Sequence, residues 1–77
     1  MSAKLRKISG QECIKILCNK FRFEVKRQKG SHIVLAKESI LGKKATTVPM
    51  HKELKIGTLK GILELAGIDE DEFAKFQ

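Results

Sequence analysis

Three extended segments stand one after another between two amphipathic helical stretches, and their connections are too short for a crossover helix. The segments are residues 23–28, 32–36 and 45–48. They alternate apolar with polar residues or are rich in β-branched residues, as strands are. Parallel neighbours need a crossover of about a dozen residues or more, whereas residues 29–31 and 38–44 leave room only for a turn and a basic loop. The segments are therefore predicted to form an antiparallel meander.

Both helical stretches carry cap signals. Residues 9–12, Ser-Gly-Gln-Glu, form a capping box, and the apolar stripe behind it predicts a helix over residues 10–20. A second helix is predicted over residues 57–66, closed by Gly67. A short last helix is predicted to begin after Asp69. The exposed Gly61 of the second helix suggests close packing and nothing further.

The predicted order α-β-β-β-α-α defines an α+β fold, a two-layer sandwich whose three-stranded antiparallel sheet carries the helices on one face. The other face of the sheet is then open to solvent. The whole chain, residues 1–77, is predicted to be a single domain, because a chain of this length supports one compact core. Cys13 and Cys18 stand too far apart on the first helix for a disulfide, so we predict that both fill the core.

The hydrophobic pattern also predicts the strand register. If the first strand buries Phe23 and Val25, a three-residue loop over residues 29–31 keeps the apolar side chains of both strands on one face. A two-residue loop over residues 29–30 would split the apolar set between the faces. The predicted register pairs Val25 with Leu35, Arg27 with Ile33 and Gln28 with His32. This register places His32 on the open face, beside a glycine turn.

Charge narrows the range of partners. The chain has 16 Lys and Arg against 9 Asp and Glu, a net charge of +7, and most of its acidic residues lie after residue 60. A basic surface attracts polyanions such as nucleic acid, although a merely well-hydrated surface has the same composition. No apolar run is long enough to span a membrane, and the first ten residues lack a signal-peptide core. We therefore expect a cytoplasmic protein without a membrane partner.

An exposed imidazole among cations has the chemistry for RNA cleavage. Histidine can accept a proton near neutral pH, nearby cations can hold a phosphate, and RNA itself supplies the 2′-OH nucleophile. No metal site has sensible ligand spacing, and no cofactor is implied. By itself, an exposed histidine such as His32 is more often without a role. His51, which follows Pro49 closely, is better interpreted as a polar loop residue.

Several blocks of the sequence, taken together, resemble the HicA (YcfA-like) toxin family. They are Arg27-Gln28-Lys29-Gly30-Ser31-His32, Thr47-Val48-Pro49-Met50-His51, Glu53 to Lys60, Ile62-Leu63 and Ala66-Gly67-Ile68. The resemblance implies a fold similar to the double-stranded RNA-binding domain and a ribosome-independent mRNA endoribonuclease, an mRNA interferase. It implies the toxin of a type II toxin–antitoxin pair, with a HicB-type antitoxin that covers the active surface. It also implies that His32 is catalytic, with Gly30 as turn former and Ser31 as a phosphate or orientation contact.

The leading hypothesis from the sequence is therefore an RNA-cleaving toxin that uses His32 as general base and acts on mRNA. The residues expected to contact RNA are Lys26, Arg27, Lys29, Gly30, Ser31, Lys43, Lys44, His51 and Lys52. Two alternatives remain. The chain could be a non-catalytic RNA-binding module that reads A-form shape, or a docking domain whose open sheet face binds a protein partner.

Overall fold

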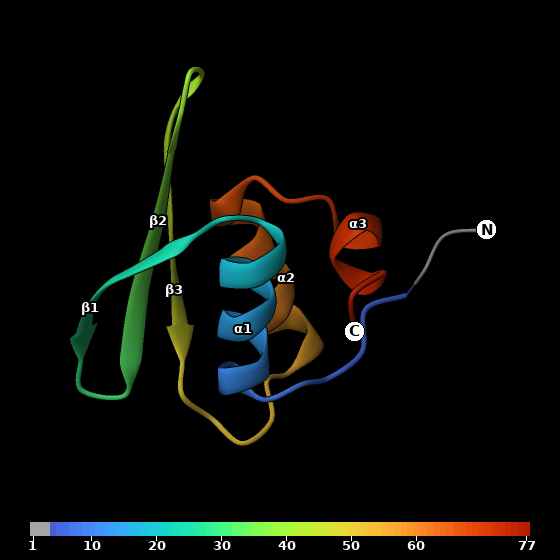
Figure 1. Ribbon diagram of the computed structural model, residues 1–77. Coiled ribbons are helices and arrows are strands. Elements are labelled where there is room, and N and C mark those ends of the chain that lie inside the picture. Colours follow the sequence, from blue (N-terminus) through green and yellow to red (C-terminus); the bar gives the residue numbers. More distant parts are fainter. Residues whose placement is uncertain (1–3) are drawn as a thin grey trace.

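The computed structural model describes residues 4–77, and it confirms the α+β fold and its antiparallel meander. The elements are α1 (Gly10–Lys20), β1 (Glu24–Lys29), β2 (His32–Ser39), β3 (Gly42–Pro49), α2 (Ile56–Ala66) and α3 (Glu70–Ala74). The strand order is β1-β2-β3, and the helices lie on one side of the sheet while the other side is open (Figure 1). In the part of the chain that the structure describes, no helix has the length and apolar character to cross a membrane.

The helix boundaries follow the local cap signals. Ser9 is the N-cap of α1, and its hydroxyl accepts a hydrogen bond from the backbone N–H of Glu12 at 3.0 Å. α1 spans the predicted residues. α2 ends at Gly67, whose φ of 70° is the left-handed cap conformation expected there. A Cβ added to Gly61 would meet no atom within 4 Å, so the interpretation of this glycine as a close-packing residue is wrong.

The β1–β2 hairpin differs from the predicted register. Val25 lies opposite Leu35 as expected, but a β-bulge follows at Lys26 and shifts the remaining pairs. The observed pairs are Arg27 with Val34, Gln28 with Ile33, and Lys29 with His32. The predicted three-residue loop is therefore wrong, since the turn contains only Gly30 and Ser31. The bulge places one additional residue in β1, which accounts for the residue that was assigned to the loop. Gly30, with φ of 60°, occupies the first central position of the turn, as in a type II′ turn.

The β2–β3 hairpin is longer than predicted. Residues 38–44 were expected to form a loop, but β2 continues to Ser39 and β3 begins at Gly42, so that only Ile40 and Leu41 form the tip. The end of this hairpin projects past the helical layer (Figure 1). Neither face is buried there, and the sequence accordingly lacks the apolar alternation that marks a half-buried strand.

The core lies between β2, β3 and the helices. Its largest fully buried side chains include Leu17, Leu35, Val48, Leu59, Leu63 and Phe73. Buried Thr46 is satisfied because its hydroxyl donates to the Ile62 carbonyl at 2.8 Å. Phe23 is buried as expected, but the expected burial of Val25 is wrong, since 52% of that residue is exposed. β1 forms the outer edge of the sheet, beyond the reach of the helices (Figure 1).

Both cysteines are free thiols, as predicted. Cys13 is fully buried in the core, and burial raises the pKa of its thiol to about 12. Cys18 is half-buried against the core, and partial burial together with the Glu24 carboxylate raises its pKa. The prediction that both fill the core therefore holds fully for Cys13 and in part for Cys18.

Candidate nucleic-acid interface

His32 is exposed at the start of β2, on the open face of the sheet. The face is fixed by its neighbours, because Ile33 and Leu35 point into the core and alternate residues point away from it. Lys29 of β1 and Pro49 of β3 lie directly opposite His32. Cross-strand partners share a face, so the imidazole stands between a cation and a proline at one end of the sheet.

The cations of β1 are arranged around this histidine. Arg27 pairs with Val34, two positions along from His32 on β2, and therefore shares the open face with His32 and Lys29. Neither Arg27 nor Lys29 belongs to an ion pair within residues 4–77. Lys26, at the bulge, contacts the Glu24 carboxylate at 3.2 Å, but an exposed pair of this kind is weak. All of these side chains are accessible to an anionic ligand.

Backbone hydrogen bonds join the β1–β2 turn to the loop that follows β3. The N–H of Met50 donates to the carbonyl of Ser31 at 2.7 Å, and the N–H of Gly10 donates to the carbonyl of His51 at 2.9 Å. The segment that carries His51 and Lys52, both exposed, therefore lies at the same end of the sheet as His32. The structure thus brings to one end of the sheet the two histidine-bearing motifs, whose histidines stand 19 positions apart in the sequence.

Gly10 is a residue of this site region that its sequence context did not reveal. A Cβ on Gly10 would lie 2.1 Å from the carbonyl oxygen of Pro49, far inside a real contact. The first turn of α1 therefore packs directly on the backbone that leads from β3 to His51. Only glycine permits this approach, which ties the position of the loop to α1.

Replacement of Gly10 by alanine is expected to destabilise the fold by about 1–3 kcal/mol, because the backbone of Pro49 must move to admit the methyl group. Alanine has a higher helix propensity than glycine, so any loss of stability in this variant reports the clash of the methyl group with the Pro49 carbonyl. Urea unfolding measures it, and Gly57→Ala is the matched control, since a Cβ on Gly57 meets no atom within 4 Å. Equal stability of the Gly10→Ala variant and the native chain would contradict the packing described here.

The basic residues near the β2–β3 tip are not brought next to His32. Lys43 pairs with Glu38 on the open face, six positions along β2 from His32, which corresponds to roughly 20 Å. Lys44 pairs with Lys37 and faces the helices, where its Cε lies 3.3 Å from the place that a Cβ on Gly67 would occupy. Lys44, which was expected from the sequence to contact RNA, therefore lies on the sheet face that carries the helices, opposite to the face of His32.

The site offers imidazole and cation chemistry. Among residues 4–77, no three His, Cys, Asp or Glu side chains gather as a metal ion would require. What the arrangement provides is an accessible proton acceptor, His32, beside two cations that form no ion pair within the described residues, and a turn whose Ser31 is exposed. These groups can hold a phosphate and take a proton from a hydroxyl near it.

Comparison with known proteins identifies the family. The sequence model of a protein family, the HicA toxin of bacterial toxin–antitoxin systems, matches residues 10–68. The match runs from the start of α1 to just past the cap of α2. The matched region includes the Gly30-Ser31-His32 turn and the loop that carries His51. No curated protein and no solved structure matches the chain. The chain belongs to the HicA toxin family, and is thus the toxin of a toxin–antitoxin pair with an antitoxin as its partner.

Proposed function

We propose that this toxin is a metal-independent mRNA endoribonuclease, neutralised by a HicB-type antitoxin. The observation that carries the proposal is the position of His32, which is exposed on the open sheet face directly opposite Lys29 and next to the Gly30-Ser31 turn. Arg27 adds a second cation on the same face. A proton acceptor and two cations therefore stand side by side on the open face of the sheet.

The reaction uses a nucleophile from the substrate. The imidazole of His32 accepts the proton of a 2′-OH, and the 2′-oxygen attacks the adjacent phosphorus. The bond from phosphorus to the 5′-oxygen then breaks, which leaves a 2′,3′-cyclic phosphate on one product and a 5′-OH, after protonation, on the other. Lys29 and Arg27 stabilise the extra negative charge on the phosphorane. Lys26, His51 and Lys52 extend the contact along the RNA backbone, where contacts carry little sequence information.

The experiment that tests this function is cleavage of a long RNA by the purified chain, beside a DNA of the same sequence and with EDTA. We expect RNA fragments that end in a 2′,3′-cyclic phosphate, intact DNA, and an unchanged rate in EDTA. The DNA control isolates the 2′-OH, because a nuclease that activates water would not need it. Loss of cleavage in EDTA, with recovery in Mg²⁺, would show that the metal-free mechanism is wrong.

A further inference from the structure

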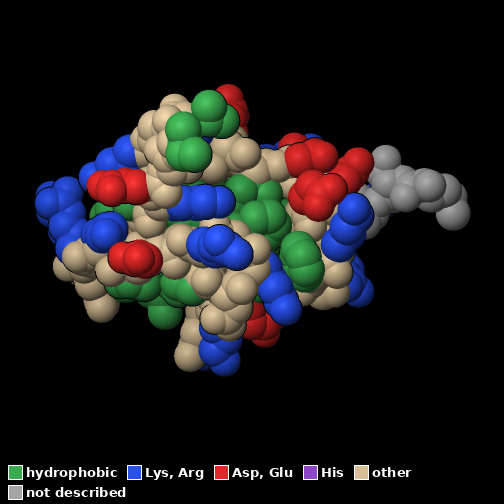
Figure 2. All heavy atoms as spheres, turned by 45° about the horizontal axis from the view of Figure 1, so that its top comes forward, with side chains coloured by type: hydrophobic (Ala, Val, Ile, Leu, Met, Phe, Trp, Pro, Cys, Tyr) green, Lys and Arg blue, Asp and Glu red, His purple; other side chains and the backbone are tan. Residues whose placement is uncertain are grey.

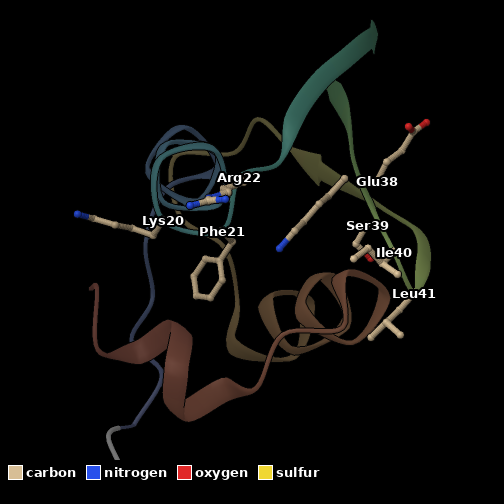
Figure 3. Close-up of a pocket in the computed structure, with 8 residues that line it drawn as sticks. Lys20, Phe21, Arg22, Glu38, Ser39, Ile40 and Leu41 are labelled. Atoms are coloured by element: carbon tan, nitrogen blue, oxygen red, sulfur yellow. The ribbon is translucent and has the colours of Figure 1, made fainter.

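A groove lies beneath the β2–β3 hairpin, at the end of β2 remote from His32. The groove is a hollow of ≈ 630 Å³, with one wall from residues 20–22 at the end of α1 and the other from residues 37–41 of the hairpin (Figure 3). A second hollow shares Phe21, Lys37, Ser39 and Leu41 with the first and continues it to the α2–α3 connection, where Asp69 and Glu72 line it. Figure 2, in which the top of Figure 1 comes forward, shows hydrophobic side chains at the tip, Lys and Arg side chains below it, and Asp and Glu side chains to either side.

The tip of the hairpin presents apolar side chains that the fold does not need. Ile40 and Leu41 are 104% and 96% exposed, the most exposed large hydrophobic residues in the described chain. A two-residue hairpin turn is normally made by glycine, asparagine or aspartate. Two adjacent aliphatic side chains that are fully open to water form a small apolar surface at the tip, available for contact with a partner.

Arg22 adds a cation in an unusual backbone conformation. Its φ is 62°, and among residues 4–77 no other residue except glycine has a positive φ. Glycine or asparagine adopts this conformation at lower cost, so the backbone does not favour arginine here. Arg22 belongs to no ion pair within the described chain, and its side chain lines the groove. A guanidinium in such a place can hold a carboxylate through two parallel hydrogen bonds.

The lining of the groove distinguishes protein from RNA as the ligand. Base stacking needs a free aromatic face, but the Phe21 ring already stacks on Phe73 at 6.0 Å and meets the edge of Phe76 at 5.6 Å. The Phe23 ring is covered by the Lys37 ammonium at 6.0 Å. The other apolar residues of the lining, Ile40 and Leu41 of the hairpin, are aliphatic and suit contact with an apolar side chain.

We propose that this groove is a docking site for an extended acidic segment of a partner protein. A large apolar side chain of that segment enters beneath Leu41, and flanking carboxylates meet Arg22 and Lys37. The groove and His32 lie at opposite ends of β2, roughly 20 Å apart. Docking therefore leaves the proposed ribonuclease site open, and the proposal does not depend on catalysis.

The test is a titration of the ¹⁵N-labelled full chain with the peptide acetyl-Glu-Asp-Leu-Phe-Asp-Glu-amide, followed by amide chemical shifts. We expect saturable shifts at Phe21, Arg22 and Leu41, with the His32 amide unmoved. The same peptide with lysine in place of each acidic residue is expected to leave these amides in place, because the three cations of the lining, Lys20, Arg22 and Lys37, outnumber its one carboxylate, Glu38.

Two variants separate the contributions of charge and apolar contact. Arg22→Gly removes the guanidinium and suits the left-handed backbone, so unfolding does not obscure it, and we expect about fivefold weaker binding. Leu41→Ser is expected to weaken binding to a similar or larger extent. The matched controls, Lys15→Ala and Leu65→Ser, alter exposed residues outside the groove and are expected to bind as the native chain does.

Three outcomes would overturn the proposal. Unmoved groove amides at millimolar peptide would show that no acidic segment binds there. Groove shifts caused by an RNA oligonucleotide instead of the peptide would make the groove an RNA surface. Groove shifts that follow dilution of the free protein would show that a second copy of the chain occupies it.

Discussion

Replacement of His32 by alanine is expected to abolish RNA cleavage while leaving the fold and RNA binding intact. The side chain is exposed, so its loss changes the free energy of unfolding by no more than about 0.5 kcal/mol. A positioned general base contributes roughly 10²–10⁴-fold to a rate, and the decrease in cleavage should fall in that range. Single-turnover cleavage measures the effect, with circular dichroism to verify the fold and a filter-binding assay to measure affinity.

The matched control is His51→Ala, which removes the other histidine at the same end of the sheet. We expect a modest loss of affinity and a cleavage rate within about tenfold of the native one, because this residue is proposed to contact the backbone. Cleavage of RNA by the His32→Ala variant at the native rate would show that His32 is not the general base. Binding without cleavage by both the native chain and the variant would favour a non-catalytic RNA-binding module, and neither activity in either would favour a docking domain.

Replacement of Phe73 by alanine is expected to have the largest effect on stability. Phe73 is fully buried and stacks on Phe21, and truncation of such a residue costs about 3–5 kcal/mol. A domain of this length has roughly 4–12 kcal/mol in total, so the substitution removes a large fraction of the stability and unfolds the chain outright if the native value lies at the low end of that range. Phe73 stands on α3, which lies beyond the region that the family model matches. This short helix is thus expected to be essential to the fold.

Urea unfolding measures the effect, and the control is Phe76→Ala. Phe76 is 43% exposed, although its ring also contacts Phe21, so its removal should cost about 1 kcal/mol. A Phe73→Ala variant as stable as the Phe76→Ala variant would show that α3 packs less tightly than described. Retained cleavage by a chain that ends at residue 68 would lead to the same conclusion.

The sequence predicted those parts of the fold that depend on local signals. Ser9 and Gly67 cap their helices through side-chain or backbone chemistry that is visible within four residues, so that α1 begins and α2 ends where these signals stand. The length of the β2–β3 hairpin could not be predicted in this way. Its tip is held by strand pairing in water, with no buried face to impose a pattern on the sequence.

The sheet face on which His32 lies was predicted correctly, although the length of the preceding loop was predicted incorrectly. Burial of Ile33 and Leu35 decides the orientation of β2, and the hydrophobic pattern showed that burial. The partner of His32 depends instead on the bulge at Lys26, within a strand whose residues are all exposed. No burial pattern could reveal the bulge, and the cross-strand neighbour was therefore expected to be Gln28 and is Lys29.

The exposed strand β1 also bears on the solubility of the chain. It pairs with β2 on one side only, so its other side offers unpaired backbone groups to which a strand of another molecule could add. The bulge at Lys26 distorts this edge, and Lys26, Arg27 and Lys29 give any approaching copy the same charge. Edge-to-edge association is therefore disfavoured without a covering element. The cations that we propose for RNA binding would then also protect the free toxin from aggregation.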